Sequence, residues 1–171
     1  MPMLQIGGSV RESITDGPGI RMTVFTQGCS HACPGCHNGH LQPFEGGIAM
    51  SVQEIMRIAS ANPLLDGLTL SGGEPFQQAC GCAGLAKAAK SAGLHVMAYT
   101  GYVFEALHDG MEDIGTHPGW KELLSSLDLL VDGPFILPQR DLLLRFRGSA
   151  NQRILDVPLS LRAGIGVPAL L

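Results

Sequence analysis

The spacing of apolar and polar residues along this chain alternates between a pattern typical of β-strands and one typical of α-helices. Short runs rich in apolar and β-branched side chains predict strands at residues 21–27, 67–71, 95–100 and 128–131. Amphipathic or alanine-rich segments predict helices at residues 51–61, 77–92, 103–108 and 120–127. Because strands alternate with helices, the pattern favours parallel βαβ units and the α/β fold class. Four strands are too few to close an eight-stranded barrel, so we expect an open partial (β/α) barrel of parallel strands.

Local signals support these boundaries. Ser51 followed by Glu54 has the spacing of a capping box at the start of the helix over 51–61. Asp16-Gly17-Pro18-Gly19 is a strong turn signal just before the first predicted strand. We therefore expect the chain to turn sharply before it enters the sheet.

Length and charge narrow the class of protein. A chain of 171 residues predicts a single domain over 1–171, with the apolar residues 159–171 as an irregular C-terminal arm. A formal net charge of −4 without a long basic run argues against nucleic acid or an anionic membrane as partner. We find no secretory leader and no apolar segment long enough to span a bilayer, which predicts a cytoplasmic protein. Five cysteines in that compartment point to metal or redox work.

The most informative stretch is CSHACPGCHN, at residues 29–38. Cys29, Cys33 and Cys36 follow a predicted strand at C-x3-C-x2-C spacing, so one loop can bring their sulfurs together. Soft thiolate ligands favour an iron–sulfur cluster or zinc. Three thiolates suit a [4Fe–4S] cluster with one open iron, whereas the addition of His40 gives a four-ligand zinc site. The loop alone does not decide between these two metals.

Two further segments follow predicted strands. Ser71-Gly72-Gly73-Glu74-Pro75 places bare backbone beside a carboxylate. Alone it fits an ordinary turn, but next to an open iron it suggests a site for a cationic amine. Asp132 also follows a strand, where a carboxylate can accept hydrogen bonds from ribose hydroxyls, although alone it fits a turn residue. Thr100 and Tyr102 likewise stand at the end of a predicted strand, and alone they fit ordinary turn residues.

The remaining candidates are weaker. The polar run over 147–153 is either an exposed loop or a segment that contacts a ligand or a partner. Cys80 and Cys82 lie near a helix start, and we interpret them as ordinary buried or half-buried thiols.

Several segments taken together resemble a known family. CSHACPGCHN and LSGGEP are similar to motifs of the radical S-adenosylmethionine family, and the DGPGIR…F…GC lead-in over 16–29 resembles its glycyl-radical-enzyme activases. More specifically, GCSHACPGCHN, LSGGEPFQQ, YTGY, LVDGPF and RGSANQRILD resemble the activating proteins of anaerobic ribonucleoside-triphosphate reductases. The cysteine spacing alone is moderately specific, but these segments occur in the same order over most of residues 10–156.

The resemblance implies which residues form the site. It implies a [4Fe–4S] cluster on Cys29, Cys33 and Cys36, which are thus both the metal ligands and the catalytic residues. It implies S-adenosylmethionine bound through its amino and carboxylate groups to the fourth iron. The implied cofactor contacts are Gly35, Cys36, His37, Gly73, Glu74 near the amino group, and Asp132 near the ribose.

The resemblance also implies an activity and its partners. An electron from flavodoxin or ferredoxin would cleave S-adenosylmethionine to a 5′-deoxyadenosyl radical. That radical would abstract a hydrogen atom from a glycine of anaerobic ribonucleoside-triphosphate reductase and leave a glycyl radical there. We expect the open side of the partial barrel to receive the glycine loop of the reductase.

The sequence departs from the family pattern in two respects. It lacks the ferredoxin-like insert of larger activases, so we expect no additional cluster. His37 stands where an aromatic residue is often found, and an imidazole can still cover the cofactor. Two alternatives stay open: an activase of another glycyl radical enzyme, of the formate-lyase type, and a non-catalytic zinc-binding adaptor.

Overall fold

One mixed sheet organises the chain. The computed structural model describes residues 2–171, which form a seven-stranded sheet of order β3-β1-β2-β4-β5-β6-β7. The strands are β1 (Met3–Ser13), β2 (Arg21–Thr26), β3 (Ile48–Ser51), β4 (Gly67–Gly72), β5 (His95–Tyr99), β6 (Leu129–Asp132) and β7 (Arg153–Asp156). The prediction of an α/β fold with parallel strands is confirmed, because β2, β4, β5 and β6 are parallel neighbours.

The sequence-based strand count was incomplete. β1 pairs antiparallel with both β2 and β3, and β7 pairs antiparallel with β6. The four predicted strands are thus the parallel centre of a wider sheet. The three antiparallel strands extend that centre at both ends, so the sheet is not made of parallel strands alone.

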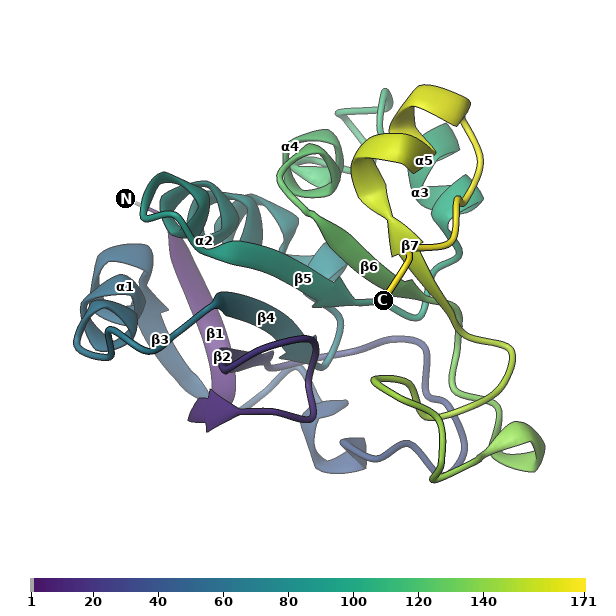
Figure 1. The fold of residues 1–171 in the computed structure, drawn as a ribbon, viewed down its shortest axis with the longest axis horizontal. Coiled ribbons are helices and arrows are strands. Elements are labelled where there is room, and N and C mark those ends of the chain that lie inside the picture. The colour runs from purple at the N-terminus through teal and green to yellow at the C-terminus, as the bar shows by residue number, and fades with distance from the viewer. Residues whose placement is uncertain (1) are drawn as a thin grey trace.

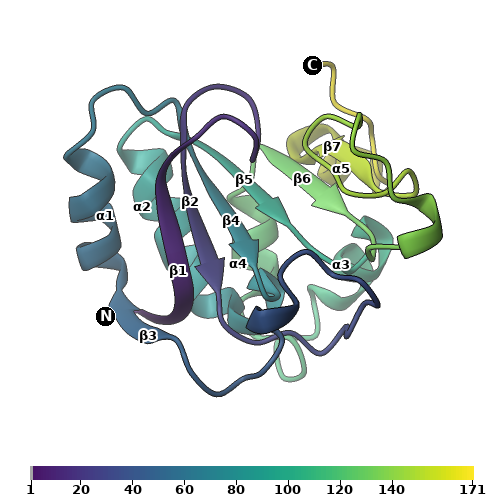
Figure 2. The same cartoon turned by 90° about the horizontal axis from the view of Figure 1, so that it is seen from below.

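The helices lie on one face of the sheet, as Figures 1 and 2 show. They are α1 (Val52–Ser60), α2 (Ala79–Ser91), α3 (Phe104–Gly110), α4 (Trp120–Ser125) and α5 (Val157–Ala163). The predicted capping box is confirmed: Ser51 accepts a hydrogen bond from the Glu54 amide and the Glu54 side chain accepts one from the Ser51 amide. The main core lies between these helices and the sheet, which contributes side chains such as Val24, Leu68 and Leu70.

Two predicted boundaries need correction. The helix predicted over 77–92 is preceded by a 3-10 turn, Pro75–Gln78, and α2 begins only at Ala79. The predicted irregular arm over 159–171 is wrong for its first residues, because 159–163 complete α5. The remaining arm packs on the sheet, where Pro168 bridges Leu155 of β7.

The other face of the sheet is closed at one end by the turn that precedes β2. Arg21 is fully buried there, and its guanidinium donates to Thr69 Oγ1, at 2.7 Å from Nε, and to the Pro18 carbonyl. Thr69 Oγ1 donates in turn to the Asp16 carbonyl, and Thr23 Oγ1 donates to the Asp16 carboxylate. These contacts tie the turn to the amino-terminal ends of the parallel strands and leave their carboxyl ends for the site.

Among residues 2–171, none of the helices has both the length and the apolar character that crossing a membrane would require.

Candidate cofactor site

The cysteine loop begins where β2 ends. Gly28 has a positive φ of 99°, which turns the chain out of the strand. The Gly28 amide then donates to the Leu41 carbonyl at 2.8 Å, and the Cys29 amide donates to the Gln42 carbonyl at 2.9 Å. These bonds join the start of the loop to its end. The loop therefore stands at the carboxyl edge of the parallel strands, where α/β folds bind ligands.

The three predicted ligands share one neighbourhood. Cys29, Cys33 and Cys36 are half-buried free thiols, and the Cys36 amide donates to the Cys33 carbonyl at 3.1 Å. Burial raises the pKa of Cys29, and the nearby charges of Glu74 and the other two thiols raise it further. Within residues 2–171, no three His, Cys, Asp or Glu side chains stand in a metal-binding arrangement. The three soft donors are nevertheless those that an iron–sulfur cluster takes.

The glycine-rich turn packs directly against this loop. The Gly73 amide donates to the Thr26 carbonyl at 2.7 Å, and the Glu74 amide donates to the Gly28 carbonyl at 2.9 Å. A Cβ atom on Gly73 would overlap the Gly28 carbonyl oxygen. Gly72 has a φ of 96°, a left-handed conformation that favours glycine. The two glycines thus permit a close backbone contact with the cysteine loop, whereas the sequence predicted close approach to a small ligand, which stays a prediction.

Glu74 lies completely buried between the two segments. Its Oε1 accepts hydrogen bonds from Thr100 Oγ1 at 2.9 Å and from the Phe76 amide at 3.0 Å. Its Oε2 accepts from the Gly101 amide at 2.8 Å and from His31 Nε2 at 2.7 Å. The YTGY segment after β5 therefore supplies two of the four groups that hold this carboxylate.

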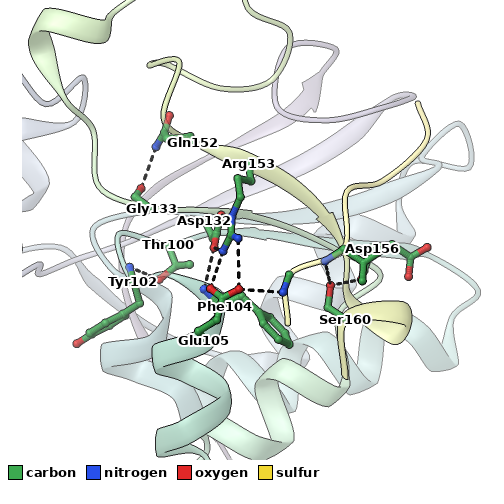
Figure 3. Close-up of polar contacts among 12 residues, drawn as sticks. Thr100, Tyr102, Phe104, Glu105, Asp132, Gly133, Gln152, Arg153, Asp156 and Ser160 are labelled. Atoms are coloured by element: carbon green, nitrogen blue, oxygen red, sulfur yellow. Dashed lines mark hydrogen bonds and ion pairs between the residues drawn. The ribbon is translucent and has the colours of Figure 1, made fainter. Parts of the chain in front are cut away.

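Asp132 stands at the end of β6 but faces a different set of partners (Figure 3). Its side chain is 1% exposed, and both oxygens contact the guanidinium of Arg153, with Nε to Oδ1 at 3.0 Å. The Phe104 amide donates to Oδ2 at 2.7 Å. Arg153 also pairs with Glu105, which accepts from the Gly166 amide at 2.9 Å. The contacts of Asp132 in this structure are those of an ion pair that joins β6 to β7.

The other predicted residues are placed as follows. Gly35 and His37 are exposed on the loop, and Gly35 lies beside Leu137 with a φ of 73°. Cys82 is buried, as expected, and burial raises its pKa. Cys80 is exposed, so its assignment as a buried or half-buried thiol was wrong.

Sequence reasoning missed His31. Its imidazole is the group of the cysteine loop that reaches Glu74, and it meets the ring of Tyr102 edge-on with 4.5 Å between centroids. The only signal in the sequence is its position between the first two cysteines. Because His31 and Glu74 are separated by 43 positions, no local pattern pairs them.

A cavity of about 590 Å³ opens beside this site rather than over it. Gln77 and Tyr102 line it and also touch Ser30 and His31 of the cysteine loop. The three predicted cysteine ligands are absent from its lining. The site is therefore located by the three thiols and not by this cavity.

Known proteins resemble this chain over most of its length. Residues 15–155 match the family model described as a 4Fe-4S single cluster domain. Anaerobic ribonucleoside-triphosphate reductase-activating proteins from Haemophilus influenzae and Vibrio cholerae are 32% and 34% identical, and each match covers 82% of this chain and 90% of the relative. The protein of that name from Enterobacteria phage T4 is 29% identical over 81% of this chain and 85% of its own.

A solved structure supports the fold. QueE from Escherichia coli superposes with a TM-score of 0.51 at 14% identity, over 59% of this chain and 53% of that chain. At this identity the likeness concerns the fold alone. The sequence relatives and the matched domain confirm the resemblance drawn from the motifs, and this chain belongs to the family of anaerobic ribonucleoside-triphosphate reductase-activating proteins.

Proposed function

We propose that this chain activates an anaerobic ribonucleoside-triphosphate reductase by creating a radical on one of its glycines. The observation that carries the proposal is the contact between the cysteine loop and the glycine-rich turn at the carboxyl edge of the parallel strands. The Glu74 amide and the Gly28 carbonyl make that contact at 2.9 Å. The names of the relatives identify the reductase as the target.

Cys29, Cys33 and Cys36 would hold a [4Fe–4S] cluster. The donor set fits, because all three thiols are free, half-buried and on one loop. A cubane cluster takes four ligands, so three cysteines leave one iron for S-adenosylmethionine. When bound, the cluster and S-adenosylmethionine supply the one-electron chemistry that removes a hydrogen atom from a glycine Cα.

The chain binds and orients that cofactor. Gly35, Cys36 and His37 would approach it from the loop. The backbone at Gly73 would receive its amino group, with Glu74, whose oxygens accept four hydrogen bonds from the protein, holding the turn in place nearby. Placement of the reacting carbon beside the target C–H bond is the main kinetic contribution of the protein, an effect that reaches ~7 kcal/mol or more in well-oriented systems. We assign Asp132 a less direct role than a ribose contact, because Arg153 and the Phe104 amide already engage its oxygens.

The protein partner approaches from the face that the helices leave free. Helices α1–α5 lie on one side of the sheet (Figure 2), so the other side offers the route to the carboxyl edge. In this proposal the sheet is an open partial barrel whose open side receives the glycine loop of the reductase. Flavodoxin or ferredoxin provides the electron.

Electron paramagnetic resonance tests the proposal. Anaerobically reconstituted protein is mixed with S-adenosylmethionine, a reductant and the anaerobic reductase, and in parallel with a formate-lyase-type enzyme. We expect a glycyl radical signal in the reductase and none in the other enzyme. A signal only in the formate-lyase-type enzyme would transfer the assignment to that partner, and protein that binds zinc without iron would reject the radical chemistry altogether.

A further inference from the structure

The cysteine loop is fastened to the glycine-rich turn by a side chain that the motifs leave unassigned. His31 lies between the first two cysteines, and its Nε2 donates to Glu74 Oε2 at 2.7 Å. A second link lies next to it, where the Ser30 amide donates to Gln77 Oε1 at 3.0 Å. The loop is thus held by the side chains of Glu74, within the turn, and of Gln77, just after it.

The segment after β5 forms a socket for the His31 ring. Gly101 leaves room for it, because a Cβ atom there would lie 2.5 Å from His31 Cδ2. Tyr102 packs its ring edge-on against the imidazole, with 4.5 Å between centroids. The same segment fixes Glu74 through Thr100 and the Gly101 amide. The YTGY motif therefore positions both partners of the His31–Glu74 hydrogen bond.

The Glu74 carboxylate has its acceptor sites filled. A carboxylate offers about four lone-pair directions, and Glu74 accepts from Phe76, Thr100, Gly101 and His31. Three of these donors hold Glu74 on the sheet: Phe76 follows the glycine-rich turn, and Thr100 and Gly101 directly follow β5. His31 is the donor from the cysteine loop, so this bond, together with the bond from Ser30 to Gln77 and that from the Glu74 amide to Gly28, fixes the loop against the sheet.

We propose that His31 is a positioning residue that fixes the cysteine loop against Glu74. The hydrogen bond holds the three thiols at one distance from the backbone of Gly72 and Gly73, and therefore fixes where S-adenosylmethionine sits relative to the cluster. This inference rests on the proposed function for the identity of the cofactor. The geometry of the fastening itself is independent of any cofactor.

Three substitutions of His31 test whether it positions the cysteine loop. In His31→Gln the amide nitrogen reaches the place of Nε2, in His31→Asn it falls short by one carbon, and in His31→Ala the donor is lost. His40→Ala is the matched control, because His40 is an exposed imidazole at the end of the same loop. Hydrogen–deuterium exchange of the cofactor-free proteins is measured for the amides of residues 29–38. We expect exchange to rise about tenfold in His31→Ala and His31→Asn, and to stay near the wild-type rate in His31→Gln and His40→Ala.

The loaded proteins give a second readout. We expect His31→Ala and His31→Asn to raise the KM for S-adenosylmethionine at least fivefold and to change the resonance spectrum of the reduced cluster on addition of S-adenosylmethionine. His31→Gln should restore both. Equal exchange and equal spectra in all four variants would overturn the role of His31. Failure of the proposed function would show separately, as wild-type protein that forms no radical in the reductase.

Discussion

The guanidinium of Arg153 faces the carboxylate of Asp132, with a terminal nitrogen 2.5 Å from Oδ2 and Nε 3.0 Å from Oδ1 (Figure 3). The Asp132 side chain is 1% exposed, whereas that of Arg153 is 38% exposed. Arg153 comes from β7, so this ion pair joins the last two strands of the sheet. A residue that its motif associates with the cofactor thus has a structural task as well.

The first prediction concerns this ion pair. Asp132→Asn should lower the free energy of unfolding of the cofactor-free protein by about 2 kcal/mol, because the Arg153 guanidinium loses its charged partner and the new amide NH2 faces groups that themselves donate. Urea denaturation measures the change. Asp109→Asn is the control, since that carboxylate is 86% exposed, and it should change stability by less than about 0.5 kcal/mol. Unchanged stability in Asp132→Asn together with weaker binding of S-adenosylmethionine would restore the ribose assignment.

The second prediction concerns the stability of the protein at low pH. The hydrogen bond from Arg153 and that from the Gly166 amide lower the pKa of Glu105 from 4.5 to about 2. Because the folded-state pKa is depressed, the stabilisation by Glu105 is complete above about pH 4.5 and is lost as the pH falls toward 2. Urea denaturation at a series of pH values should show this loss in the wild type. Glu105→Gln should have a flatter profile over that window, and an unchanged profile would contradict the assignment.

The third prediction separates the loop cysteines from the others. Cys33→Ala should keep the fold but lose most of its iron and all cleavage of S-adenosylmethionine, because a cluster ligand is missing. Cys80→Ala should keep both, since its exposed thiol lies on α2 outside the loop. Iron analysis and the brown colour of anaerobic protein report the result. Near-normal iron in Cys33→Ala would refute its role as a ligand.

The fourth prediction distinguishes the two metals. His40 would complete a zinc site with the three cysteines, but it is exposed at the end of the loop. His40→Ala should therefore leave the iron content and the cluster colour unchanged. Metal analysis by mass spectrometry provides the measurement. A colourless wild type with one zinc, which is lost in His40→Ala, would favour the adaptor instead.

The fifth prediction tests the backbone contact. A Cβ atom on Gly73 would overlap the Gly28 carbonyl, so Gly73→Ala must push the cysteine loop away. We expect a loss of about 1–3 kcal/mol in stability, typical of overpacking, and a strong loss of S-adenosylmethionine binding. Gly39→Ala is the matched control because nothing lies within 4 Å of its added Cβ. Wild-type binding in Gly73→Ala would show that this turn lies outside the cofactor site.

The parallel centre of the fold could be predicted because its strands and helices carry strong local patterns. β1 was missed because Gly7, Gly8 and Ser9 interrupt its apolar residues, and much of the strand is exposed. β3 and β7 are four residues each and bury only one residue apiece, whereas the equally short β6 buries all four and reads as an apolar run. β7 also follows a polar run. Their pairing depends on tertiary contacts that no local window contains.

The same limit applies to the site. The sequence predicted that the cysteine loop and the glycine-rich turn are neighbours, because both follow parallel strands and such strands end at the same edge of the sheet. It could not pair His31 with Glu74, or Asp132 with Arg153, which are 43 and 21 positions apart. Which side chains pair depends on the tertiary packing of the loops against the sheet, and no local sequence pattern contains that information.

The C-terminal arm has a consequence for the protein outside its chemistry. The Asp156 amide donates to the Val167 carbonyl and the Ala169 amide donates to the Ile154 carbonyl, both at 2.9 Å, so the arm covers the outer edge of β7. An uncovered strand edge is a template for pairing with another chain. The arm therefore keeps this edge of the sheet from pairing with a second copy of the chain.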